Sequence, residues 1–280
     1  MSELIVGKPV RLSATVVRVL APNPSVFTGP GTNSYLIARG NDIVVLDPGP
    51  AAATHLAALL AAADALGGTI RDIICTHTHE DHSPGAAPLA ARTGARLIGN
   101  AAPNDGYNDL SFCPDLTPPD DSVIDAGGVR LRVVATPGHV SNHLCYLLEG
   151  ENLLFTGDHL IQGSTVVIVP PEGSMRDYLN SLTRLETLPL AAIAPGHGEV
   201  MPDPAHTIAA TTRHRLAREA KTLRALRDLR TASLDELLPR VYDDVPTFMH
   251  LAARLSLQAH LIKLVEDGTI AGLSPERWQA

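Results

Sequence analysis

The sequence predicts an α/β fold in which strands and helices alternate along the chain and stack in layers. Short apolar runs rich in β-branched residues, such as 42–46 and 70–75, have the composition of buried strands. They alternate with Ala- and Leu-rich stretches such as 51–66, which ends at a Gly pair typical of a helix C-terminus. The 280 residues are enough for one large domain and a small appendage.

The elements follow from these signals in chain order. Gly- and Pro-containing turns separate most of them, and a hairpin turn at 149–151 joins two of the later strands. Residues 100–122 contain four prolines and are expected to form an irregular functional loop, in which Tyr107 and Phe112 either line a pocket or anchor the loop. We expect strands over 10–20, 35–38, 42–46, 70–75, 96–98, 129–135, 144–148, 152–155 and 191–194, and helices over 51–66, 83–93, 174–188 and 204–230.

Composition narrows the class of protein. A net charge of −8 argues against a surface that binds nucleic acid over its whole extent, although a local basic patch is compatible with it. Three scattered cysteines fit a reducing compartment better than a disulfide framework. The N-terminal residues lack the pattern of a secretion signal, and the chain has no apolar run of 18 residues. We therefore expect a cytoplasmic protein without a membrane partner.

The most informative segment is 76–82, Thr-His-Thr-His-Glu-Asp-His, directly after the expected strand 70–75. It contains four potential metal ligands within six residues: His77, His79, Asp81 and His82. One ion rarely takes four ligands from so short a segment, so the spacing predicts two metal ions that share ligands.

Further His and Asp residues stand where later strands end. His139 follows the strand 129–135, Asp158 follows a Gly at the end of 152–155, and His197 lies between two glycines after 191–194. A carboxylate such as Asp158 can bridge two cations. Asp47, at the end of 42–46, can orient a ligand loop as a hydrogen-bond acceptor that does not itself bind the metal. His143 is expected near the site as a substrate contact or proton donor.

The order of these motifs resembles that of the metallo-β-lactamase fold superfamily over roughly residues 10–203. The resemblance implies an αββα sandwich with the site on loops between the two sheets, and it makes Asp47 the supporting carboxylate. It also implies a hydroxide held between two metals as the nucleophile, with Asp81 as a further candidate for steering its proton. We expect two zinc ions, with iron or manganese left open. In this resemblance the ligands are His77, His79 and His139 on one ion and Asp81, His82 and His197 on the other, with Asp158 between them.

The C-terminal part predicts a separate helical appendage. The helix 204–230 has seven basic residues against two acidic ones, which fits either a solvated linker helix or a phosphate-binding face. Ser233 and Glu236 have the spacing of a capping box at the start of one helix. We expect a second helix from about 248, a third helix through 255–264 and then a short wing. We expect a catalytic domain over 1–203, a linker helix over 204–230 and a winged-helix-like domain over 231–280.

Catalytic core and tail together resemble a β-lactamase-like branch that includes the mitochondrial endoribonuclease. The segments that carry this resemblance are GTNSYLI, TPGHVSNH, PGHG and RHRLARE. It implies a metal-dependent hydrolase of phosphodiesters such as RNA, with small-molecule esters, thioesters or lactones as the alternative substrates. Hydrolysis of β-lactams, or an inert core that binds nucleic acid or a partner, are lesser alternatives. A homodimer is left open.

Overall fold

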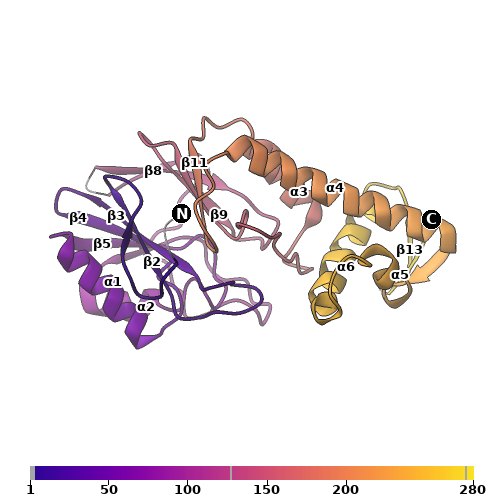
Figure 1. The fold of residues 1–280 in the computed structure, drawn as a ribbon, viewed down its shortest axis with the longest axis horizontal. Coiled ribbons are helices and arrows are strands. Elements are labelled where there is room, and N and C mark those ends of the chain that lie inside the picture. Colours follow the sequence, from indigo (N-terminus) through magenta and orange to yellow (C-terminus); the bar gives the residue numbers. More distant parts are fainter. Residues whose placement is uncertain (1–3, 127, 275) are drawn as a thin grey trace. The chain divides into compact units, whose positions relative to one another are not determined.

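The computed structural model describes residues 4–126, 128–274 and 276–280. The expected start of the catalytic domain at Met1 lies outside the described residues. Contacts divide the chain into two compact units. The first comprises residues 1–136, 142–166 and 188–204, and the second comprises 137–141, 167–187 and 205–280. Figure 1 shows the course of the chain and labels many of the elements named below.

The first unit contains two sheets that differ in the direction of their strands. In the six-stranded sheet, the N-terminal strands are antiparallel, whereas β4, β5 and β6 run parallel to one another. Its strands, in spatial order, are β1 (Val10–Arg11), β2 (Val16–Leu20), β3 (Asn33–Arg39), β4 (Asp42–Leu46), β5 (Thr69–Ile74) and β6 (Arg96–Ile98). The five-stranded sheet has the order β11 (Ala192–Pro195), β10 (Leu153–Gly157), β9 (Leu144–Leu148), β8 (Val129–Ala135) and β7 (Val123–Ala126).

A buried apolar layer joins these two sheets face to face. Val44 and Ile74 from the first sheet and Leu131 and Val133 from the second belong to one core cluster, and each is fully buried. The rings of Tyr35 and Phe155, one from each sheet, have centroids 5.0 Å apart. Burial of these side chains is the main source of stability for the sandwich.

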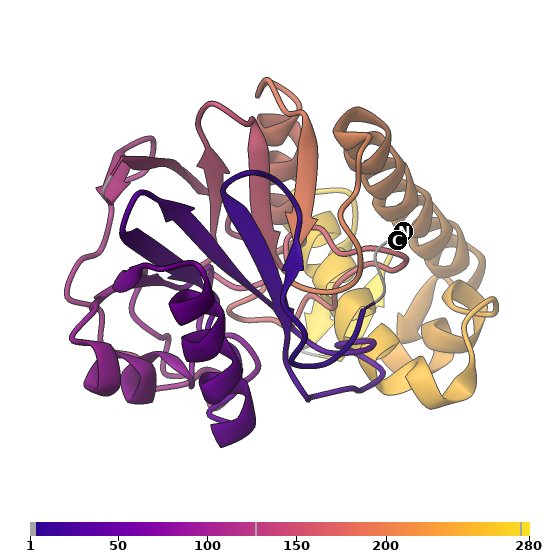
Figure 2. The ribbon, with the colours of Figure 1, turned by 60° about the vertical axis from the view of Figure 1, so that its left-hand side comes forward.

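Two helices cover the outer face of the first sheet. They are α1 (Ala53–Ala65) and α2 (Ala86–Thr93), and Figure 2 shows both against the indigo and violet strands. Leu56 and Leu59 of α1 and Leu89 of α2 pack in a second apolar cluster with the strand residues that point away from the other sheet. Strands buried on both faces explain the nearly continuous apolar runs in the sequence.

The expected elements of this unit are confirmed, with one strand divided. The stretch 10–20 is a hairpin of β1 and β2, because the Ser13 hydroxyl accepts hydrogen bonds from the amides of Thr15 and Val16 at 3.2 and 3.1 Å and turns the chain. Side chain to backbone bonds of this kind compete with an extended strand.

The second unit contains the remaining helices and a small three-stranded sheet. Its elements are α3 (Met175–Leu185), α4 (Pro204–Leu229), β12 (Thr231–Ser233), α5 (Leu234–Val241), the 3-10 turn η1 (Thr247–Met249), α6 (His250–Glu266), β13 (Ala271–Ser274) and β14 (Arg277–Gln279). Leu226, Leu237, Leu257 and Leu261 pack around the buried Trp278. The expected capping box is present, since Ser233 and Glu236 bond reciprocally at the start of α5.

One expectation for the tail was wrong. The helical patterns near 248 and over 255–264 are not two helices, because α6 runs without interruption over His250–Glu266. Thr247–Met249 forms only a 3-10 turn before it. Among the described residues, no helix combines the length and apolar character that a membrane crossing requires.

Candidate metal centre

Strand β5 delivers the His-rich loop to the edge where two parallel strands end. β4 pairs in parallel with β5, with Leu46 opposite Ile74, so Asp47 and Thr76 emerge side by side. The amide of Leu144 donates to Thr76 O at 2.7 Å, and the Tyr146 hydroxyl donates to Cys75 O at 3.0 Å. The second sheet therefore holds the start of the ligand loop directly.

Asp47 is the acceptor around which this loop is built. It is 1% exposed and accepts hydrogen bonds from Thr76 N at 2.7 Å, Thr76 Oγ1 at 2.9 Å and His82 Nδ1 at 3.0 Å. Because Nδ1 of His82 donates to a carboxylate, Nε2 is the nitrogen that faces the interior of the site and that can bind a metal ion. Asp47 has a φ of 49°, a conformation in which Asp and Asn are enriched.

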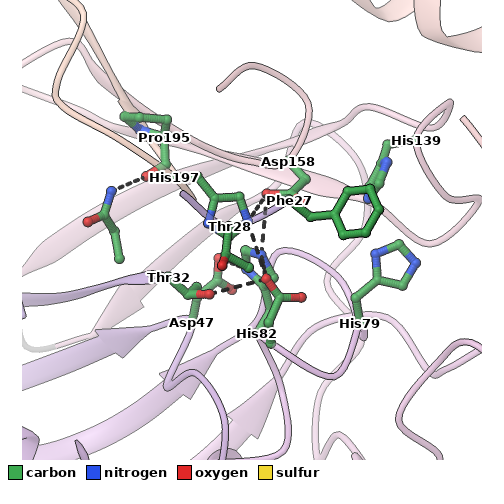
Figure 3. Close-up of polar contacts among 12 residues, drawn as sticks. Phe27, Thr28, Thr32, Asp47, His79, His82, His139, Asp158, Pro195 and His197 are labelled. Carbon is green, nitrogen blue, oxygen red and sulfur yellow. Dashed lines mark hydrogen bonds and ion pairs between the residues drawn. The ribbon is translucent and has the colours of Figure 1, made fainter. Parts of the chain in front are cut away.

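Two carboxylates and two imidazoles converge on one point (Figure 3). Nε2 of His197 lies 3.2 Å from Asp81 Oδ2 and 3.1 Å from Asp158 Oδ1. Nε2 of His82 lies 3.4 and 3.3 Å from the same two oxygens. Ligands of a tetrahedral zinc at 2.0–2.1 Å are separated by about 3.3 Å, so these spacings fit a shared cation.

The loop between β2 and β3 supports His197 and Asp81. Gly31 O accepts from His197 Nδ1 at 3.3 Å, and the Thr32 hydroxyl donates to Asp81 Oδ2 at 3.1 Å. Gly31 has a φ of 144°, and a Cβ there would lie 2.2 Å from Ala21 O. The Gly/Pro turn formed by residues 28–31 therefore brings its backbone directly to a candidate ligand, and only Gly fits at position 31.

His77 and His79 form a second group of imidazole nitrogens. His77 Nε2 lies 3.0 Å from His79 Nδ1, and the two rings meet edge to face with centroids 4.6 Å apart. His77 Nδ1 is 3.0 Å from Thr76 Oγ1, which itself donates to Asp47, so Nδ1 carries the proton and Nε2 holds a lone pair. A bound cation would take the lone pairs of both facing nitrogens.

His139 lies on the turn after β8 and belongs to the second unit. Its Nδ1 donates to Val167 O at 2.7 Å, which leaves Nε2 as the nitrogen that can bind a metal. Its participation in the centre remains a prediction.

Burial and charge act in opposite directions on the titratable groups. Burial alone would lower the pKa of His82, but the carboxylates of Asp81, Asp158 and Asp47 raise it well above its ordinary value. Against the same cost of burial, Asp158 raises the pKa of His197 to about 10. Burial would raise the pKa of both Asp81 and Asp158, but the imidazoles lower it. A metal ion supplies the positive charge that these protons otherwise supply.

One further observation indicates that these donor atoms fit a metal ion. His82 Nε2 is fully buried and makes no hydrogen bond among the described residues, although it faces two carboxylates. Two groups of three residues share His82, namely His77–His82–Asp158 and Asp81–His82–His197. Within each group, the potential ligand atoms lie within 4.8 Å of one another. Five of the expected ligands therefore gather around two adjacent positions.

His143 and the 100–122 loop have roles that the sequence left open. His143 is 1% exposed, and both of its ring nitrogens have hydrogen-bond partners inside the unit. Asn108 and His79 form an isolated antiparallel β-bridge through their backbones, and Asp109 N donates to Thr78 O at 2.6 Å. The loop therefore packs on the His-rich segment. Phe112 is an apolar anchor at 3% exposure, whereas Tyr107 is 64% exposed.

Sequence reasoning did not single out two threonines that the site uses. Thr76 connects Asp47 to His77, and Thr32 holds Asp81. Thr76 stands immediately before the His-rich segment, and Thr32 immediately after the Gly/Pro turn. Position next to a ligand motif was the available signal, but a Thr there is not distinctive by itself.

A two-sheet sandwich with a His/Asp cluster at the ends of its strands defines a class of metal-binding hydrolases. The family model described as "Metallo-beta-lactamase superfamily" matches residues 27–197, and the one described as "Beta-lactamase associated winged helix domain" matches 233–278. The chain belongs to the metallo-beta-lactamase superfamily, with this winged helix at its C-terminal end.

Individual proteins similar to the chain cover nearly its whole length. A "Beta-lactamase-like protein 2 homolog" of Caenorhabditis elegans is 29% identical, over 93% of this chain and 87% of the relative. An "Atrochrysone carboxyl ACP thioesterase" of Aspergillus chevalieri is 31% identical, over 93% of this chain and 84% of the relative. The structure of a beta-lactamase domain protein from Burkholderia ambifaria has a TM-score of 0.82 at 19% identity, over 100% of this chain and 95% of that one.

Proposed function

We propose that this hydrolase cleaves thioesters with an apolar acyl group, using two divalent metal ions. His77, His79 and His139 would hold one ion, and Asp81, His82 and His197 the other, with Asp158 between them. The imidazole and carboxylate donors favour zinc, and iron or manganese remain alternatives. Support for the thioester comes from the relative in Aspergillus chevalieri that is named a thioesterase and that aligns over most of both chains.

The observation that carries the substrate class is an exposed aromatic side chain beside the site. Phe27 and its neighbour Val26 are 56% and 64% exposed, and they lie on the same loop between β2 and β3 as Gly31 and Thr32, which contact His197 and Asp81. Hydrogen bonds from Phe27 N to Ser25 Oγ at 3.1 Å and from Thr28 Oγ1 to Asn23 O at 2.6 Å hold the backbone on either side. Large exposed apolar groups on a loop that also supports the candidate ligands fit an apolar acyl chain.

The reaction adds water to the acyl carbon and breaks the carbon–sulfur bond, which gives a carboxylic acid and a thiol. When bound, the metal ions polarise the carbonyl and lower the pKa of water from about 15.7 to about 7. Asp81, oriented by the Thr32 hydroxyl at 3.1 Å, takes up the proton of the attacking water and returns it to the leaving sulfur. The side chain of Asp81 is 26% exposed, which gives it access to substrate and solvent.

A phosphodiesterase acting on RNA is the competing proposal, and it depends on the basic helix α4. Three of its cations have internal partners. Arg218 and Lys221 pair with Asp244 and Asp243, and the guanidinium of Arg215, 3% exposed, lies 5.1 Å from the centroid of the Tyr178 ring. Pairing of this kind leaves less positive charge for a phosphate backbone, so we place the thioester first.

The test is a substrate series on protein with a measured metal content. Acyl thioesters of increasing chain length are compared with single-stranded RNA, a lactone and a β-lactam, each with and without chelator. We expect chelator-sensitive thioester turnover whose kcat/KM rises by up to about fourfold for each methylene buried, from about 0.8 kcal/mol per methylene. Chelator-sensitive RNA cleavage without thioester turnover would overturn the proposal.

A matched pair of variants tests the role of Phe27 in the same series. In Phe27→Ala the dependence on chain length should flatten, while metal content stays at the wild-type level. Leu273→Ala removes an equally exposed apolar side chain, 52% exposed, from the second unit and should leave the series unchanged. An unaltered series in Phe27→Ala would remove the structural support for an apolar acyl chain.

A further inference from the structure

We infer that His143 is a positioning residue, which fixes the main-chain amide of Asp158 through a single neutral tautomer and so holds the bridging carboxylate in place. The inference rests on the proposed metal centre, because the position of Asp158 matters most if two cations share it.

The contact that defines this role joins a ring nitrogen to a backbone amide. Asp158 N lies 3.2 Å from His143 Nε2, at the point where β10 ends and the chain turns into the site. A backbone N–H can only donate a hydrogen bond, so Nε2 of His143 must be the acceptor and must carry no proton. The proton of the neutral ring is therefore on Nδ1.

The second ring nitrogen continues the same chain of hydrogen bonds. Nδ1 of His143 lies 2.9 Å from Thr136 Oγ1, whose hydroxyl donates to Cys145 Sγ at 3.2 Å. The Cys145 thiol in turn points at Thr156 O, 3.9 Å away on β10. Thr136, His143 and Cys145 are at most 1% exposed, so these directions are set inside the protein. A proton on Nε2 would place two donors against each other.

Close packing shows why the amide of Asp158 needs this support. Gly157 has a φ of 44°, and a Cβ there would lie 2.3 Å from Thr76 Oγ1 and 3.0 Å from His143 Nε2. On the other side, a Cβ at Gly196 would lie 2.8 Å from Asp158 Oδ1. The chain thus passes between Thr76 and His143 without side-chain bulk, and the hydrogen bond from Asp158 N to His143 Nε2 fixes the orientation of the next peptide.

This geometry separates His143 from the groups that act on substrate. Both of its nitrogens are engaged and the ring is 1% exposed, so it acts through the residues that it contacts. These are Asp158, through the hydrogen bond, and His77, whose ring centroid lies 5.0 Å from that of His143. We therefore propose positioning in place of the substrate contact or proton donation expected from the sequence.

Two substitutions at this position test the acceptor directly. In His143→Gln the side-chain carbonyl can take the place of Nε2 and accept from Asp158 N, whereas in His143→Asn the shorter amide reaches only toward Thr136. The readout is zinc affinity, measured by competition with a chromophoric chelator, together with the absorption spectrum of the cobalt-substituted protein. Loss of a residue that orients a metal ligand typically weakens metal affinity about 10–100-fold.

We expect His143→Asn to lose metal affinity by about this factor and to change the cobalt spectrum, and His143→Gln to stay within about threefold of the wild type. Thermal unfolding of the metal-free forms controls for folding. A merely structural role would lower the stability of both variants and leave the cobalt spectrum of the folded protein unchanged. Should His143→Asn not fold, Thr136→Val decides, because it removes the acceptor for Nδ1 and should weaken metal binding.

Wild-type affinity in folded His143→Asn or Thr136→Val would overturn the inference, as would an equal loss in the Gln and Asn variants. A wild-type protein that binds no metal would instead overturn the proposed function on which the inference rests. The two failures are thus distinguishable in one set of titrations.

Discussion

The substitution Asp47→Asn should weaken both metal binding and the stability of the metal-free protein. The Asn side chain has nearly the same shape, and Asn tolerates the φ of 49° at this position, so the backbone should be preserved. The change replaces one carboxylate oxygen by an amide that donates. In the wild type, Oδ1 accepts from Thr76 N, and Oδ2 accepts from both Thr76 Oγ1 and His82 Nδ1.

Either orientation of the new amide leaves one donor facing another. With the amide nitrogen at the Oδ2 position, His82 can avoid the conflict only by moving its proton from Nδ1 to Nε2, the nitrogen that faces Asp81 and Asp158. With the opposite orientation, Thr76 N loses its acceptor. A buried donor without an acceptor costs about 1–3 kcal/mol, and we expect this loss in the free energy of unfolding of the metal-free protein. Metal affinity should fall about 10–100-fold.

The assay combines a zinc competition titration with chemical denaturation of the metal-free protein. Asp64→Asn, at an exposed position of α1, makes the same chemical change away from the site and should alter neither quantity. If Asp47→Asn binds zinc as tightly as the wild type, the tautomer of His82 is not set by Asp47 and the reasoning is refuted.

Three further results are expected from other contacts in the structure. Asp158→Ala should lose metal and turnover together, and a purified variant that retains two ions and full activity would show that Asp158 does not bridge. Removal of metal by chelator should abolish activity and lower the melting temperature, and zinc should restore both; turnover that resists metal depletion would contradict this. Hydrogen bonding to Arg218 lowers the pKa of Asp244 to about 2, so the stability that it provides is present above the ordinary pKa of a free carboxyl and is lost as the pH falls toward 2. Fluorescence of Trp278, the single tryptophan, should show Asp244→Asn less stable than the wild type at pH 7, with a difference that shrinks below pH 4; a pH-independent difference would contradict it.

The fold was predictable because its periodicities are local. Residues 42–46 and 129–135 are uninterrupted apolar or alternating runs, and the strands have these bounds in the structure. The division of 10–20 depended on a single Ser13 hydroxyl that competes for backbone amides, which the alternating pattern does not reveal. The error over 248–264 arose because Phe248, in the 3-10 turn, and Leu251, at the start of α6, are apolar but 73% and 76% exposed. Their apolar character resembled the buried face of a separate helix.

The site was predictable only in part. The candidate ligands are His and Asp residues that directly follow strands, a combination that can be recognised in the sequence. Five of them gather around two adjacent positions in the first unit. The groups that orient them do not have such a signal. Thr76 donates to Asp47, 29 residues earlier in the sequence, and the tautomer of His143 depends on an amide 15 residues later. Such roles follow from three-dimensional geometry and not from residue type.

The central claim is that two metal ions bound at this cluster support hydrolysis of a thioester. It is tested most directly by adding zinc in steps to metal-free protein while thioester turnover and bound metal are measured on the same sample. We predict that turnover rises until two equivalents are bound and then stays constant, and that Asp158→Ala shows neither the binding nor the turnover. Full turnover in the absence of metal, or two tightly bound equivalents without turnover of any acyl thioester, would contradict the claim.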